Sequence, residues 1–445
     1  MKAGSKFIFI TLLAMLLVGC SGGKPVNIND QTADNAAVPF AYRALYDELY
    51  TQLNSLRSAV DSRWNGKKSA VRFGVELLVA NSNRGEILLT ERVLEGTRLT
   101  LERLKDLGVR SIAVSIQYPI LTASFRRSAD YRKFYRQVAE EIRRRGFVLI
   151  VEMGTMFREP EFSKIKINYR GLTLGQFRDG LKEMAGAIIS DMRPDYLTLF
   201  TEPGTQAQNT GLDFSVSNFS STIRHVASGL NRSSVRIGAG AGTWDDMAYF
   251  EALAPMAQLD YLDLHIYPVQ RDFVIDRVWR VADMAQRYGK SVSIGEAWLY
   301  KVSERELAIS PVKAFARDVF SFWQPLDILF LETIINLSHQ IQADFCSFFW
   351  MKYLYGYLEY NSTTRRLTPQ QRIDRVDAVA ARQILDNRLN DAGNRFKKLI
   401  ATESSTTRTA GSLDFTAKGG KRQGHAVPQS LRVEPGAKHP VWKTQ

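Results

Sequence analysis

The sequence predicts an α/β fold, a closed (β/α)8 or TIM barrel with an extra N-terminal helix and a disordered C-terminal tail. Short apolar runs alternate with segments of helical periodicity eight times between residues 37 and 400. Parallel strands require crossover connections, and right-handed crossovers can close such a sheet. An open doubly wound sheet would usually place a glycine-rich phosphate-binding turn after its first strand. Residues 81–85 read Asn-Ser-Asn-Arg-Gly at that position, which favours the barrel.

The predicted strands are dense in apolar residues, as expected of parallel strands that are covered on both faces. They span residues 71–79, 111–118, 147–152, 195–202, 235–240, 261–267, 291–296 and 345–350. The helices that follow them span residues 88–107, 131–145, 173–192, 214–230, 244–256, 273–288, 312–340 and 369–400, with a break near Pro325. Gly108, Gly146 and Gly289 follow three of these helices, which is typical of helix C-termini.

One further helix is predicted before the first strand. Between residues 38 and 64, leucine and tyrosine recur at spacings of three and four residues, which indicates an amphipathic helix. We expect this helix to cover the bottom of the barrel.

Both ends of the chain differ in composition from the predicted barrel domain at residues 37–400. Residues 1–20 read as an export signal, and Leu17-Val-Gly-Cys20 resembles the lipobox of bacterial lipoproteins. That resemblance implies that Cys20 carries a lipid anchor and that the mature protein lies outside the cytoplasm, in the outer membrane if the source is Gram-negative. An ordinary cleaved signal is the alternative. Residues 21–36 form a polar tether, and residues 401–445 a disordered basic tail.

Composition and motifs exclude several classes of function. The formal net charge is +13, yet no basic helix with interleaved aromatic residues is present, so we expect a solvated basic surface and no nucleic-acid partner. Only Cys20 and Cys346 occur, and without paired cysteine spacing we expect no metal site. Walker A, HExxH and EF-hand patterns are absent. The Gly-Ala-Gly-Ala-Gly segment at 238–242 is interpreted as close packing or a tight loop.

Two glutamates end predicted strands, Glu202 on the fourth and Glu296 on the seventh. In a (β/α)8 barrel the C-terminal ends of the strands meet at one mouth, so these carboxylates are expected to lie close together. A pair of carboxylates is what hydrolysis of a glycosidic bond requires. Either glutamate alone could instead be a surface residue or an ion-pair partner.

Other side chains are predicted at the same mouth. Glu152 ends the third strand, His265 and Tyr267 end the sixth, and Trp298 and Trp350 follow the seventh and eighth. Aromatic rings stack on the apolar faces of sugar rings, so a carboxylate pair with aromatic neighbours favours a carbohydrate ligand. Packing in the core is the alternative for any single aromatic side chain.

These residues resemble the motifs of clan A glycoside hydrolases, which are retaining enzymes on this barrel. The matching positions are Glu202-Pro203, His265-Ile-Tyr267, Glu296 and Trp350. The resemblance implies double displacement on a β-linked poly- or oligosaccharide, with Glu296 as nucleophile and Glu202 as acid/base. It also implies that Tyr267 holds Glu296 and that His265 orients the site, with no cofactor.

Two departures from that pattern leave alternatives open. Thr201 stands where the clan usually has an asparagine that binds the substrate's 2-hydroxyl, and the usual arginine on the second strand is not evident. A catalytically inactive carbohydrate-binding or surface-assembly lipoprotein on the same barrel is therefore the second hypothesis. A third is an enzyme for another substrate that also uses Glu152. The sugar, its linkage and the oligomeric state stay open.

Overall fold

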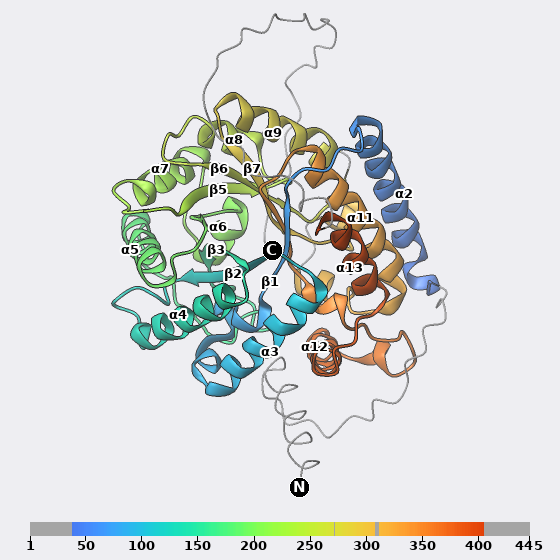
Figure 1. Cartoon of the computed structure of the whole chain (residues 1–445). Helices are drawn as coiled ribbons and strands as arrows, with labels where there is room; N and C mark the ends of the chain where they lie inside the picture. Colours follow the sequence, from blue (N-terminus) through green and yellow to red (C-terminus); the bar gives the residue numbers. More distant parts are fainter. Residues whose placement is uncertain (1–37, 271, 308–310, 405–445) are drawn as a thin grey trace, which may run out of the picture.

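The computed structural model describes residues 38–270, 272–307 and 311–404 and confirms the closed parallel barrel (Figure 1). The strands pair in sequence order, and β1 pairs with both β2 and β8, which closes the sheet. The expected signal sequence, Cys20, the tether and the tail beyond residue 404 lie outside the described residues. Within those residues, no helix combines the length and the apolar character that crossing a membrane requires.

All eight strands lie where the sequence predicts them. Their bounds are β1 Arg72–Glu76, β2 Ser111–Tyr118, β3 Val148–Thr155, β4 Tyr196–Thr198, β5 Arg236–Gly242, β6 Tyr261–Ile266, β7 Ser291–Ala297 and β8 Phe345–Phe348. The first strand is shorter than predicted, because the chain turns into a 3-10 helix at Leu78–Ala80. The fourth is also shorter, since β4 ends at Thr198, four residues before Glu202.

The helices that surround the strands also follow the prediction, with three differences. Their bounds are α3 Glu91–Leu107, α4 Ser128–Arg144, α5 Leu174–Met192, α6 Pro203–Thr210, α7 Val216–Ala227, α8 Met247–Leu253, α9 Arg277–Arg287, α10 Pro311–Phe315, α11 Gln324–Gln340, α12 Pro369–Leu385 and α13 Asp391–Ser404. Helix α6 was not predicted, because it is short and polar. The predicted break near Pro325 is confirmed, but it separates the region over 312–340 into two helices, α10 and α11. The predicted helix over 369–400 is also two helices, and Asn387 takes a left-handed conformation (φ 54°) after α12.

The N-terminal helix α2 (Phe40–Arg63) does not cover the bottom of the barrel. It lies along the outside beside α11 (Figure 1). Its apolar stripe of Leu49, Leu53, Leu56 and Val60 is buried. The apolar period therefore predicted the helix but not the surface that it covers.

Aromatic side chains fill the N-terminal end of the barrel. The rings of Tyr196, Tyr261 and Phe345, from β4, β6 and β8, pack edge to face with centroids 4.9–5.8 Å apart. A Cβ at Gly238 on β5 would overlap the Tyr261 ring, so the glycine-rich segment provides space for close packing within a strand. Because this layer fills the N-terminal end of the barrel, a ligand-binding site is expected at the C-terminal end.

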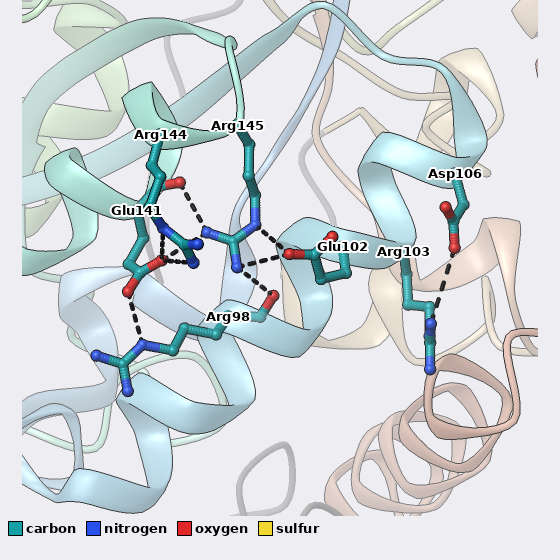
Figure 2. A network of polar contacts seen from close by, with 7 residues as sticks. All are labelled: Arg98, Glu102, Arg103, Asp106, Glu141, Arg144 and Arg145. Atoms are coloured by element: carbon teal, nitrogen blue, oxygen red, sulfur yellow. Dashed lines mark hydrogen bonds and ion pairs between the residues drawn. The ribbon is translucent and has the colours of Figure 1, made fainter.

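An ion-pair network joins helices α3 and α4 at the surface (Figure 2). Arg145 Nη1 lies 2.6 Å from Glu141 Oε2, and Arg145 Nη2 lies 2.9 Å from Glu102 Oε1. Burial alone would raise the pKa of Glu141, but hydrogen bonds from Arg145, Arg144 and Arg98 lower it to about 2. The network ties together two neighbouring helices of the outer ring.

Candidate active site

The chain turns sharply at Glu202, four residues after the end of β4. This residue has a left-handed backbone conformation (φ 50°, ψ 64°), and Pro203 then begins α6. Residues other than glycine rarely adopt this conformation, and such positions cluster at functional sites. The turn places Glu202 in the wall of a cavity of about 1420 Å³ at the C-terminal end of the barrel.

A bulge in β7 places the second glutamate. Leu264 pairs with Ile294, but the next residue, His265, pairs with Glu296, so Gly295 is an extra residue in β7. A Cβ at Gly295 would lie 2.5 Å from Asp263 Oδ2 and 2.6 Å from Glu152 Oε1. Only glycine fits beside these carboxylates, and the bulge sets Glu296 opposite His265.

His265 lies between the carboxylates. Its Nδ1 is 2.7 Å from Glu202 Oε1 and 3.7 Å from Glu296 Oε2, while its Nε2 is 3.6 Å from Glu152 Oε2. The oxygens of Glu202 and Glu296 can therefore be no farther apart than the sum of the two Nδ1 distances. Both carboxylates therefore lie close enough to contact the same sugar residue. The structure thus brings Glu202, Glu296, His265 and Glu152 together.

Tyr267 forms a hydrogen bond with one oxygen of Glu296. The Tyr267 hydroxyl donates a hydrogen bond of 2.7 Å to Glu296 Oε2. Tyr267 follows β6, and its ring meets Trp244 edge to face with centroids 5.9 Å apart. One oxygen of Glu296 is thereby fixed by a neutral donor.

Burial sets the charges of this cluster. Burial and the charge of Glu202 raise the pKa of Glu296 to about 7, although His265 and the Tyr267 hydroxyl oppose the rise. Burial alone would lower the pKa of His265, but the surrounding carboxylates raise it well above its usual value. Burial also raises the pKa of Glu152 well above its usual range. The carboxylates therefore favour the charged form of His265, and burial favours the protonated forms of Glu152 and Glu296.

Further acids lie beneath and beside the predicted residues. Glu76 accepts a hydrogen bond from Asn81 Nδ2, and burial together with the charge of Glu296 raises its pKa to about 8. Burial raises the pKa of Asp245, which lines the cavity, to about 7. Asp263 Oδ2 lies 3.8 Å from His265 Nε2. The sequence analysis missed Asp263, although it alternates with His265 and Tyr267 on one face of a strand.

The predicted aromatic residues have different positions. Trp350, which follows β8, lines the cavity together with Phe349. Trp298 does not reach the cavity. It is 1% exposed and stacks on Tyr353, with ring centroids 5.7 Å apart. The structure therefore places Trp298 in the core, where it packs against the segment that follows β8.

Thr201 lines the cavity beside Glu202. The residue is buried, and its short side chain lies one position before the left-handed turn. A threonine hydroxyl donates and accepts through one atom close to the backbone, whereas an asparagine amide carries its donor and its acceptor on two separate atoms and reaches farther.

Three side chains of the cluster could also contact a cation. One ligand atom from each of Glu152, His265 and Glu296 lies within 4.8 Å of the other two. Metal coordination requires a neutral imidazole, however, and the carboxylates favour the charged form of His265.

No protein-family model and no curated protein matches the chain. Among solved structures, an exo-β-1,4-mannosidase from an Opitutaceae bacterium is 10% identical, with a TM-score of 0.49, over 77% of this chain and 61% of that one. Cel5A from Hypocrea jecorina is 13% identical, with a TM-score of 0.42, over 66% and 91%. A GH30 endoxylanase from Clostridium papyrosolvens is 11% identical, with a TM-score of 0.41, over 64% and 67%. Similarity at this level concerns the fold alone, which many functions share.

Proposed function

We propose that the protein is a retaining glycoside hydrolase that cleaves a β-linked poly- or oligosaccharide. The observation that carries this proposal is the approach of Glu202 and Glu296, from the ends of β4 and β7, to the same nitrogen of His265. Two carboxylates that approach one nitrogen support a mechanism in which both act at a single anomeric centre, as double displacement requires.

The first step is displacement at the anomeric carbon. A carboxylate oxygen of Glu296 forms a bond to this carbon while the bond to the leaving oxygen breaks, and Glu202 donates a proton to that oxygen. His265 Nδ1, 2.7 Å from Glu202 Oε1, can supply this proton. The Tyr267 hydroxyl keeps the other oxygen of Glu296 in place.

The second step releases the sugar. Glu202 removes a proton from a water molecule, the water oxygen bonds to the anomeric carbon, and the bond to Glu296 breaks. Two inversions retain the configuration. Trp350 and Phe349 in the cavity wall offer ring faces to the pyranose, while Thr201 and Glu152 offer polar contacts.

An activity screen tests the proposal. The wild type is expected to hydrolyse at least one aryl β-glycoside or β-linked polysaccharide, and Glu296→Ala is expected to lose the activity. If both proteins are inert while sugars still bind, the second candidate holds, a carbohydrate-binding barrel without turnover. The short side chain of Thr201 favours that candidate, because it weakens a contact that strengthens in the transition state.

The proposal includes an extracytoplasmic location. Leu17-Val-Gly-Cys20 supports lipidation of Cys20 and attachment to a bacterial membrane. Expression of the full chain and of Cys20→Ala in bacteria, followed by membrane fractionation and mass spectrometry of the N-terminus, tests this. The wild type should carry acyl chains and sediment with membranes, and an unmodified soluble wild type would contradict the location.

A further inference from the structure

One arginine in the cavity wall forms no ion pair with any residue that the structure describes. Arg84 lies in the 3-10 segment Ser82–Leu89 after β1 and lines the same cavity as the two glutamates. Its side chain is half-buried, and its Nε is inaccessible to solvent and makes no hydrogen bond within the described residues. No ion pair joins its guanidinium to an acid in the described ranges. A charged group in this position lacks the contacts that usually offset burial.

Other cations of the cavity differ from Arg84 in this respect. Lys352 Nζ lies 2.7 Å from Asp377 Oδ1, and Arg280 lies 3.6 Å from Glu251. Lys352 Nζ also lies 4.7 Å from the centre of the Trp350 ring, so this end of the cavity continues from the aromatic wall of the sugar site. The charge of Asp377 acts on Arg84 as well. The charge of Asp377 thus acts on two cations, Lys352 and Arg84, but Asp377 forms its ion pair with Lys352.

The electrostatics of Arg84 agree with a site that binds an anionic ligand. Burial lowers the pKa of Arg84 to about 10, and the charge of Asp377 opposes this only in part. Leaving a buried charge unpaired is strongly unfavourable, whereas a ligand anion would restore the balance. Because Arg84 Nε is enclosed, a ligand would contact the terminal nitrogens Nη1 and Nη2, which can donate two parallel hydrogen bonds to a carboxylate or a sulfate group.

We propose that Arg84 marks a subsite for an oxyanion on the saccharide, either the carboxylate of a uronic acid or a sulfate ester. This inference rests on the proposed function and narrows it, because the substrate is then an acidic saccharide. The Trp350 side of the cavity holds the sugar ring next to the subsite, and Arg84 pairs with the acidic substituent.

Binding measurements on the intact chain test the subsite without requiring turnover. Titration calorimetry compares cellobiose with cellobiouronic acid and with cellobiose 6′-sulfate, which differ from it only in the oxyanion. The wild type should bind at least one acidic probe about tenfold more tightly than cellobiose, and the preferred probe distinguishes carboxylate from sulfate. Arg84→Gln should remove the preference. Arg280→Gln, which removes a cavity arginine that already has an acid partner, should retain it.

Two additional measurements separate this inference from the proposed function. Arg84→Gln should melt no lower than the wild type, since it removes an unpaired charge, and a marked loss of thermal stability would assign Arg84 a structural role instead. Inorganic sulfate should raise the melting temperature of the wild type more than that of Arg84→Gln, because non-specific stabilisation by sulfate is common to both proteins.

The outcomes are distinct. Equal affinity for cellobiose and both acidic probes, or a preference that survives Arg84→Gln, overturns the subsite and leaves the hydrolase proposal standing. If no sugar binds but sulfate stabilises the protein through Arg84, the oxyanion site stands and the saccharide function fails. If neither sugars nor sulfate bind, both are wrong.

Discussion

The hydroxyl of Tyr267 contacts the proposed nucleophile directly, through the hydrogen bond of 2.7 Å to Glu296 Oε2. Tyr267→Phe should lower kcat about 10- to 100-fold, because one oxygen of Glu296 loses its donor while the sugar contacts remain. KM should change little. Steady-state kinetics on the substrate found in the activity screen measures both constants. An unchanged kcat would show that the hydrogen bond does not act in the rate-determining step.

The ionisation of Glu296 should set the acidic limb of the pH profile. Only the carboxylate form attacks, so kcat/KM should rise as the pH increases through about 7, the pKa to which burial and the charge of Glu202 raise Glu296. Glu202→Gln removes that charge and should move the limb to lower pH. The Glu202→Gln variant lacks the general acid, so its pH profile is measured with an aryl glycoside whose leaving group departs without protonation. A limb that stays in place would show that the two glutamates do not interact.

The residues of the site could be predicted where a strand end fixes them. Glu202, Glu296, His265 and Tyr267 each follow the last apolar residues of a predicted strand, and parallel strands bring such ends together. Trp298 follows a strand too, but its ring lies in the core. The periodicity of apolar residues does not predict where a single side chain after a strand points. Arg84 was missed for a related reason, since its 3-10 segment has no extended periodicity.

At the scale of elements, the bulge in β7 holds the acidic cluster together. Gly295→Ala should reduce activity at least tenfold and lower the free energy of unfolding by about 1–3 kcal/mol, because its methyl group would overlap Asp263 and Glu152. Chemical denaturation and kinetics measure the two effects. Gly186→Ala in α5 is the matched control: its methyl group meets open space and should stabilise the helix slightly. Normal activity in Gly295→Ala would contradict this role of the bulge.

The elements themselves could be predicted because local pattern and fold agree. The strands are apolar on both faces, and glycine or asparagine in a left-handed conformation ends several helices, as at Gly108 (φ 96°). The position of α2 could not be predicted. An amphipathic period specifies that one face is buried, but several surfaces of a barrel can bury it, and the choice of α11 depends on contacts distant in the sequence.

At the scale of the whole molecule, buried acids should make stability depend on pH. Burial raises the pKa of Glu76 to about 8 and of Asp245 and Asp318 to about 7, above their values in the unfolded chain. The folded state then binds more protons than the unfolded state, so stability is greatest below about pH 4 for these groups and falls as the pH rises toward 8.

Thermal melts between pH 5 and pH 8 measure this dependence. The melting temperature should fall across the range, and Asp318→Asn, a change remote from the catalytic pair, should flatten the decline. Glu141 has the opposite shift, but its pKa of about 2 places its contribution outside this range. A melting temperature that rises with pH would contradict the assignment of buried, protonated acids.

Covalent trapping tests the central claim most directly, namely that Glu296 attacks a sugar held between it and Glu202. An activated 2-deoxy-2-fluoro β-glycoside slows both displacement steps, and its good leaving group lets the glycosyl-enzyme accumulate. Peptide mass spectrometry should find one fluoroglycosyl group on Glu296 in the wild type and none in Glu296→Ala. A label on another residue, or no label on a protein that hydrolyses the parent glycoside, would contradict the account.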